Sequence, residues 1–222
     1  MKRALVRLHR RDAIGVITAA ALLPLMGSRS TIRTARSEVA SADAEAVVSD
    51  LAVQIWQQLD RPDLNDQQRI DALATLLESK TDVDLLSRLV LGRYWNQLSD
   101  EQRTRYRALF RDVVMRNFAR RLNLYANDSR GQLEDHFTII SSAPAGKQDA
   151  LVRSRVRPQS GETLAVDWRL RQGDDGPVII DLIIEGVSLL VSQRSEFAAV
   201  IERSDMEGLL AELQARASPT KS

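Results

Sequence analysis

A few ionisable side chains in this sequence could do acid–base chemistry. Asp135 directly precedes His136, and Asp181 lies four residues before Glu185. Adjacent strand residues point to opposite faces, so Asp135 and His136 do not form a working pair. Asp181 and Glu185 would share a strand face, and we interpret them as a structural hydrogen-bonded or salt-bridged pair. An enzyme on a cone-shaped α+β scaffold, with His136 or Asp181 as its base, is kept as an alternative hypothesis.

The motifs of metal, serine and nucleotide chemistry are missing. The sequence has no cysteine, which excludes disulfides and thiolate chemistry, and its two histidines are His9 and His136. It contains neither HExxH nor GxSxG. Gly146-Lys147 lacks the preceding glycine and the following Ser or Thr of a phosphate-binding loop. We therefore expect no metal, no cofactor and no enzymatic activity.

Residues 1–42 have the three parts of an export signal peptide. Basic residues come first, an apolar run of 14 residues follows from Ala13 to Met26, and Ala40-Ser41-Ala42 offers small residues for cleavage before Asp43. A spanning helix needs about 20 residues. The alternative is an uncleaved signal anchor. We predict a signal peptide at 1–42, one domain at 43–217 and a disordered tail at 218–222.

Signal removal changes the charge of the protein. The whole chain has a formal charge of +1, whereas residues 43–222 contain 23 Lys or Arg and 28 Asp or Glu, a net charge of −5. Nucleic-acid binding needs a concentrated basic surface. The sequence therefore argues against a nucleic-acid partner.

The first half of the chain is expected to be helical. Apolar residues recur there at steps of three and four, which predicts helices. A long helix begins after a capping box formed by Ser99 and Gln102. The expected helices cover 44–59, 66–79, 81–92 and 99–127.

After Gly131 the apolar period changes from about 3.6 to 2, which predicts strands. Short turns between them favour antiparallel neighbours. The fourth strand is apolar on nearly both faces, so we expect it to be central and covered. The expected strands cover 133–141, 149–157, 162–171 and 178–185, and two closing helices cover 188–201 and 205–216.

Two segments resemble the MlaC family, also called the toluene-tolerance family. Leu89-Val90-Leu91-Gly92-Arg93-Tyr94-Trp95, followed by Ser99-Asp100-Glu101-Gln102, resembles its LGRYW…SPEQ region. Asp181-Leu182-Ile183-Ile184-Glu185-Gly186-Val187-Ser188, continuing to Phe197, resembles its DVxxEGVSLxxxxRSxF signature. The resemblance covers most of 45–215. One departure is Pro177, where family members commonly have an aromatic residue.

The resemblance implies an α+β fold in which a curved antiparallel sheet of about four strands is wrapped by N-terminal and C-terminal helices around an apolar cavity. It implies a periplasmic monomer that binds phospholipid or a related lipid and contributes to outer-membrane lipid asymmetry. The implied partners are an inner-membrane ABC transporter complex and an outer-membrane lipoprotein complex. A hopanoid-associated branch leaves the cargo open. Arg194 would pair with a carboxylate or meet a headgroup, and the pairing is favoured.

We place the lipid-binding surface on inward positions of the strands and of the helices facing them. Each of these residues could instead be packed core, because patterning does not distinguish a filled core from a cavity. A further alternative is a cavity-free adaptor that docks through the Arg-rich face of the long helix. The predicted lining consists of Leu89, Phe110, Val114, Phe118, Phe137, Ile139, Val152, Val156, Val166, Trp168, Ile180, Leu182, Ile184, Val187 and Leu190.

Overall fold

The computed structural model describes residues 40–124, 132–158 and 161–217. Most of the predicted signal peptide and the whole predicted tail lie outside the described residues. The proposed cleavage position before Asp43 falls in the first turn of α1 (Ser41–Leu59). The end of the predicted long helix, after 124, also lies outside the described residues.

The helices agree closely with the sequence pattern. After α1 follow α2 (Asp66–Ser79), α3 (Val83–Leu91), the 3-10 helix η1 (Gly92–Gln97), α4 (Asp100–Asn123), a single turn α5 (Leu133–His136) and α6 (Leu189–Ala217). The last element contains both predicted closing helices, which are separated by non-helical backbone at Ser204 and Asp205.

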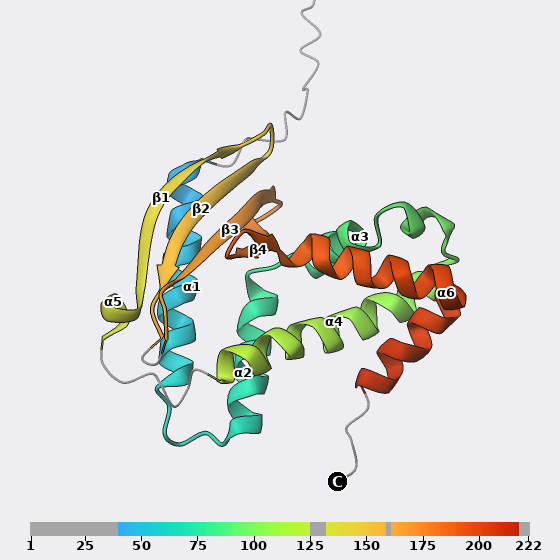
Figure 1. Ribbon diagram of the computed structural model, residues 1–222, viewed down its shortest axis with the longest axis horizontal. Coiled ribbons are helices and arrows are strands. Elements are labelled where there is room, and N and C mark those ends of the chain that lie inside the picture. The colour runs from blue at the N-terminus through green and yellow to red at the C-terminus, as the bar shows by residue number, and fades with distance from the viewer. Residues whose placement is uncertain (1–39, 125–131, 159–160, 218–222) are drawn as a thin grey trace, which may run out of the picture. The chain divides into compact units, whose positions relative to one another are not determined.

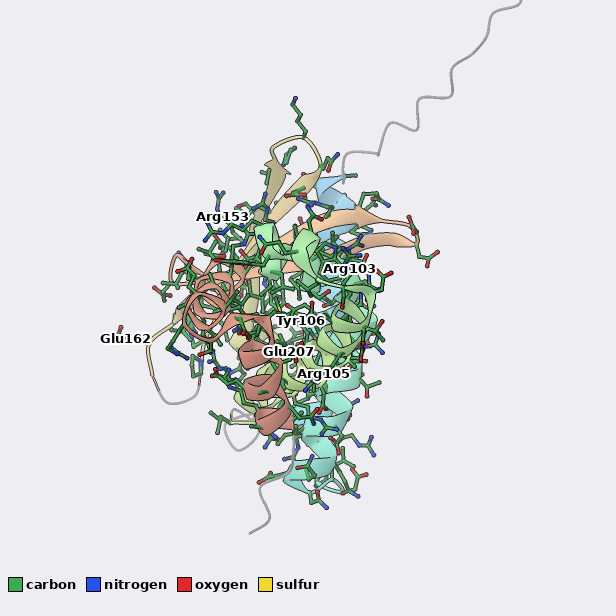
Figure 2. All side chains as sticks on the ribbon, turned by 90° about the vertical axis from the view of Figure 1, so that its right-hand side faces the viewer. Arg103, Arg105, Tyr106, Arg153, Glu162 and Glu207 are labelled. Carbon is green, nitrogen blue, oxygen red and sulfur yellow. The ribbon has the colours of Figure 1, made fainter. Side chains whose placement is uncertain are left out.

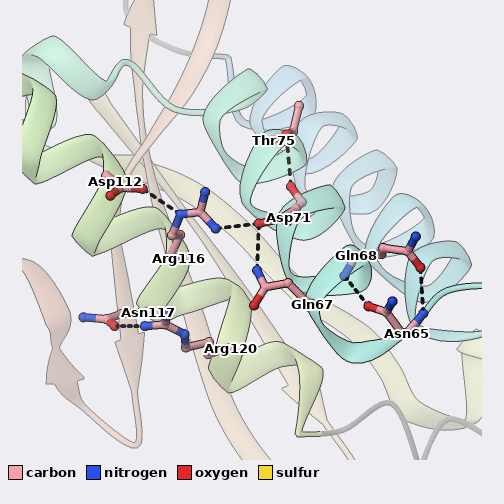
Figure 3. A network of polar contacts seen from close by, with 9 residues as sticks. All are labelled: Asn65, Gln67, Gln68, Asp71, Thr75, Asp112, Arg116, Asn117 and Arg120. Atoms are coloured by element: carbon pink, nitrogen blue, oxygen red, sulfur yellow. Dashed lines mark hydrogen bonds and ion pairs between the residues drawn. The ribbon is translucent and has the colours of Figure 1, made fainter. Parts of the chain in front are cut away.

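Side-chain caps fix where the helices begin. Ser99 Oγ accepts from the Gln102 amide at 3.2 Å while the Gln102 side chain accepts from the Ser99 amide at 3.1 Å, so the predicted capping box is present. Asn65 and Gln68 form a second box at the start of α2 (Figure 3). Asp82 caps α3 by accepting from the Leu85 amide at 2.8 Å.

The sheet contains five antiparallel strands in the order β1-β2-β3-β4-β5. Their bounds are β1 (Phe137–Ala145), β2 (Asp149–Val156), β3 (Leu164–Gly173), β4 (Gly176–Ile184) and β5 (Val187–Ser188). As predicted, β2 and β3 alternate between a buried and a wetter face. Pro177, at the second position of β4, pairs in the ladder with Gln172.

The start of the first strand was predicted wrongly, and one short strand was missed. Residues 133–136 form the helical turn α5, because β2 ends at Val156, opposite Phe137, and leaves no partner for an earlier start of β1. The fourth strand lies between β3 and β5, so it is an interior strand as expected, but the sequence pattern did not reveal β5, which pairs with it through a two-residue turn. Both turn residues have positive φ, 49° at Glu185 and 79° at Gly186, as a type I′ hairpin requires.

Two partly exposed arginines pair with a buried aspartate where β2 begins and β3 ends. Asp149 is 2% exposed and pairs with Arg169 and Arg171, each at 2.6 Å. Burial acts to raise the pKa of Asp149, but the hydrogen bonds and charges of Arg171 and Arg169 outweigh it and lower that pKa. These ion pairs therefore stabilise the β2–β3 pairing while Asp149 is ionised.

The apolar core has two parts. In one, α1 runs along β1 and β2 (Figure 1) and packs Val48 and Leu51 on the inner sheet residues Val152 and Leu170. The other joins α2, α3, α4 and α6 around fully buried aromatic side chains. Burying a large apolar side chain contributes about 1.5–3 kcal/mol. The inner face of the sheet is therefore shared between α1 and the helical cluster.

Polar contacts on the outer side of α4 tie it to its neighbours. Arg116 of α4 donates to Asp112 at 2.6 Å and also to Asp71 of α2 (Figure 3). Arg105 donates to Glu207 of α6 at 3.2 Å (Figure 2). These contacts hold α4 between α2 and α6, which positions the residues described next.

Candidate functional site

A cavity of about 510 Å³ lies where the sheet meets the helical cluster. This volume is within the range of about 300–1,000 Å³ that is common for ligand pockets. Residues of α2, α3, α4, β3, β4 and α6 contribute to its wall. The site thus depends on segments far apart in the sequence.

One stripe of α4 forms the longest side of the cavity. Phe110, Val114, Phe118 and Arg121 all line it and recur at steps of four and three, so they share one helix face. Their exposure rises along the chain: Phe110 is fully buried, Val114 is 5% exposed, Phe118 is half-buried and Arg121 is exposed. The cavity therefore opens to solvent towards the C-terminal end of α4.

A rigid aromatic cluster lies behind the buried end of this stripe. The ring of Phe110 contacts Phe197 edge to face at a centroid distance of 6.4 Å, and Tyr106 tilts against Phe110 at 5.6 Å. The Tyr106 hydroxyl donates to the Ser87 carbonyl at 3.2 Å, and burial raises its pKa. Such aromatic contacts favour one arrangement over others and so hold the inner wall in place.

The sheet contributes a β-bulge and a fixed indole ring. Arg169 pairs with Asp181 and Leu170 with Ile179, so Ile180 is an extra residue of β4 and lines the cavity. Trp168 Nε1 donates to Ser154 Oγ at 3.0 Å, and that hydroxyl donates to the Val166 carbonyl at 2.7 Å. This chain of hydrogen bonds satisfies the buried indole N–H and fixes the ring at the cavity wall.

Hydrogen bonds at the start of α6 complete the wall. Asp181 is 7% exposed and accepts from the Ser188 hydroxyl at 2.5 Å and from the Leu190 amide at 2.9 Å. Farther along, Arg216 donates to Glu196 at 3.0 Å, which joins the two halves of α6 beside the cavity. The polar groups of this wall are thus largely engaged with one another.

The structure brings seven of the fifteen predicted lining residues to the cavity. They are Phe110, Val114, Phe118, Trp168, Ile180, Leu182 and Leu190. Their positions agree with the predicted lining, while binding of a lipid by these residues stays a prediction.

The other eight predicted residues do not line this cavity. Five of them pack in or against the core between α1 and the sheet, because α1 covers part of the sheet face that the pattern marked as inward; these are Phe137, Ile139, Val152, Val156 and Val166. Leu89 and Ile184 are half-buried elsewhere, and Val187 is 57% exposed in the β4–β5 hairpin. Alternation identifies an apolar face but not the element that covers it.

Several lining residues were missed by the sequence analysis. Asn117 and Arg121 continue the Phe110–Val114–Phe118 stripe at helical spacing, so this pattern could have revealed them. Ile179 could not be assigned, because the bulge that places it depends on pairing with β3. The remaining polar residues come from α6 and its neighbours, and no local pattern shows that they face a cavity, although four of them fall within the segment 181–197 that resembles the family signature: Thr81, Asp181, Ser192, Gln193, Glu196 and Arg216.

The candidate catalytic groups have structural contacts. His136 does not line the cavity; its ring stacks on Trp56 at a centroid distance of 4.8 Å, and its Nδ1 lies 2.8 Å from the Arg157 carbonyl oxygen. Glu185 accepts from the Ala165 amide, whereas Asp181 holds the start of α6. Asp181 and Glu185 therefore do not hydrogen-bond to each other, and each carboxylate accepts from backbone amide or hydroxyl groups instead. No cluster of three or more His, Asp or Glu side chains occurs among residues 40–124, 132–158 and 161–217.

Arg194 also has a structural contact, although not the one expected. Its guanidinium donates to the Leu89 carbonyl near the end of α3, not to a carboxylate. Gly92 lies beside this guanidinium and has a φ of 54°, which favours glycine, whereas an added Cβ would only reach ordinary contact distance, 3.5 Å from Arg194 Nε. The contact joins the two segments that carry the family-like motifs.

An α+β domain with a largely apolar hollow between its sheet and its helices belongs to the class of ligand-binding proteins. The family described as MlaC protein matches residues 45–215, and the chain belongs to this family. A solved structure of a phospholipid-binding protein from Ralstonia solanacearum, in complex with a phospholipid, is similar to it with a TM-score of 0.64 and 28% identity. The match covers 81% of this chain and 97% of the other. None of the described helices is both long and apolar enough to cross a membrane.

Proposed function

We propose that this protein is a periplasmic lipid carrier that encloses phospholipid acyl chains and moves lipid between the outer membrane and an inner-membrane ABC transporter. The observation that carries the proposal is the cavity of about 510 Å³ between the sheet and the helices. Membership of the MlaC family and the phospholipid bound by the Ralstonia relative support it.

Hydrophobic transfer explains why such a carrier must enclose its cargo. At about 0.8 kcal/mol per methylene, a sixteen-carbon tail left in water would cost on the order of 12 kcal/mol. Phe110, Val114 and Leu182 offer apolar surface in place of water. Because a bilayer offers a tail the same gain, transfer between the two is near balance, and a partner can drive it in either direction without a chemical reaction in this chain.

The export route and the partners form the second part of the proposal. The basic start, the apolar run and the small residues at Ala40-Ser41-Ala42 support a cleaved signal peptide and a periplasmic location. The partners would be an inner-membrane ABC transporter complex and an outer-membrane lipoprotein complex. Neither requires a nucleotide site in this chain, whose Gly146-Lys147 lacks the phosphate-loop pattern.

Lipid that copurifies with the protein tests the proposal directly. The mature protein made in bacteria is analysed by native mass spectrometry and by lipid extraction, and bound phospholipid is expected. Leu182→Asp should abolish lipid retention because it places a carboxylate in the apolar wall, whereas His136→Ala, away from the cavity, should retain lipid. Wild-type protein that never carries lipid would contradict the proposal.

The same extraction separates the alternative hypotheses. A hopanoid-related lipid in place of phospholipid would identify the other cargo. For an enzyme with His136 or Asp181 as its base, the histidine variant would lose function in cells while it still holds lipid. The contacts of His136 with Trp56 and of Asp181 with Leu190 favour the carrier.

A further inference from the structure

The polar end of the cavity contains Arg121, a cation for which the described residues provide no ion pair. Four charged side chains line the cavity: Arg121, Asp181, Glu196 and Arg216. Glu196 is neutralised by Arg216, and Asp181 accepts from Ser188 and Leu190. Among the residues that the structure describes, no carboxylate forms an ion pair with Arg121. The formal charges of the two arginines and two carboxylates balance, but Arg121 differs from Arg216 because no described carboxylate engages its guanidinium, which is left available to an anion.

The position of Arg121 matches the length of a lipid tail. Arg121 follows Phe110 by eleven residues on the same stripe of α4, which at ~1.5 Å per residue separates them by roughly 16 Å. One leaflet of a bilayer, half of a ~30 Å hydrocarbon core, is about 15 Å thick. A tail that reaches the buried ring of Phe110 would thus bring its headgroup to the exposed guanidinium of Arg121.

We propose that Arg121 binds the phosphate of the lipid headgroup and makes the cavity selective for phospholipids over neutral lipids with the same tails. This inference rests on the proposed lipid-carrier function and adds to it the residue that recognises the headgroup. Guanidinium presents a planar set of N–H donors that fits two phosphate oxygens at once. A neutral diacylglycerol or a hopanoid hydrocarbon offers no such anion and gains nothing from this residue.

The chain offers a matched control on the same helix. Arg111 is also an exposed arginine of α4, it has no ion pair among the described residues, and it does not line the cavity. Replacing Arg111 or Arg121 by Gln removes one positive charge from the same helix. A difference between these two variants therefore reports the position of Arg121 and not net charge.

The test is a competition between two lipids that differ only in the headgroup. Delipidated mature protein is incubated with vesicles that contain phosphatidylglycerol and the diacylglycerol with identical chains, and the bound lipids are extracted and quantified. Arg121→Gln should lower the ratio of bound phosphatidylglycerol to diacylglycerol roughly five- to tenfold relative to wild type. Arg111→Gln should leave the ratio unchanged, and Arg121→Lys, which keeps the charge but loses the planar set of donors, should give a ratio between those of wild type and Arg121→Gln.

The remaining outcomes separate failure of the phosphate site from failure of the carrier function. If wild type takes up both lipids and Arg121→Gln has the wild-type ratio, the phosphate site is refuted while the carrier function stands. If wild type takes up neither lipid, the carrier function fails and this inference fails with it. Glycerol 3-phosphate at millimolar concentration should not release bound phosphatidylglycerol; release would show that a free phosphate ester is the ligand and would overturn the proposal.

Discussion

Replacing Val114 by Phe tests whether the cavity is a true hollow. Val114 is 5% exposed and lines the cavity between Phe110 and Phe118. Phe has about four more carbon atoms than Val, so the new ring should displace about four methylenes of a bound tail. At about 0.8 kcal/mol for each methylene, lipid binding should weaken by about 3 kcal/mol, on the order of a hundredfold.

The protein should keep its stability while it loses lipid. If the space at Val114 is hollow, the added ring fills it and the free energy of unfolding of the lipid-free protein stays unchanged or rises. Val113 provides the control, because it is equally buried in the helical core and does not line the cavity. The same substitution there overpacks the core and should cost about 1–3 kcal/mol.

Two measurements decide this prediction. Delipidated Val114→Phe, Val113→Phe and wild type are reloaded with phosphatidylglycerol and analysed by native mass spectrometry, and urea unfolding gives their stability. The reasoning is refuted if Val114→Phe binds as much lipid as wild type and is destabilised as much as Val113→Phe. That result would mean that the space at Val114 is filled core.

Two further predictions concern the sheet. Asp149→Asn should lower the free energy of unfolding at pH 7 by about 2 kcal/mol, because Arg169 and Arg171 lose their buried counterion but can still reach solvent. Because the pKa of Asp149 is lowered in the folded state, its ionisation stabilises the fold at pH values above its ordinary pKa of 3.8. This contribution is lost as the pH falls through the folded-state pKa. Urea unfolding should therefore show a smaller difference between Asp149→Asn and wild type at pH 3 than at pH 7. Ser154→Ala should destabilise by about 1–3 kcal/mol in the same assay, because Trp168 Nε1 loses its buried acceptor. A wild-type unfolding curve for the serine variant would contradict the role given to this hydroxyl.

The features that could be predicted from the sequence are those set by neighbouring residues. The start of α4 follows from the local exchange between Ser99 and Gln102, and the faces of β2 and β3 follow from alternation. The two-residue strand β5 and the bulge at Ile180 depend on pairing with segments elsewhere in the chain. A local sequence pattern does not indicate such pairing, so the strand β5 and the bulge were missed.

The candidate site was predictable only in part for the same reason. Phe110, Val114 and Phe118 were placed correctly because one helix face repeats along α4. Val152 and Val166 have equally clear inward positions, yet α1 covers them. Whether an apolar position meets a neighbouring side chain or a hollow depends on how the layers meet in three dimensions, which no single segment determines.

The kink at Ser204 and Asp205 has a consequence for the order of events during biogenesis. The kink turns the second half of α6 back, so that Arg216 donates to Glu196. Both residues line the cavity, whose first lining residue along the sequence is Leu77. A nascent chain that is still emerging from a ribosome or a translocation channel therefore lacks a complete cavity wall until almost the last turn of α6 has emerged. Cargo can accordingly be enclosed on all sides only after the second half of α6 has been made.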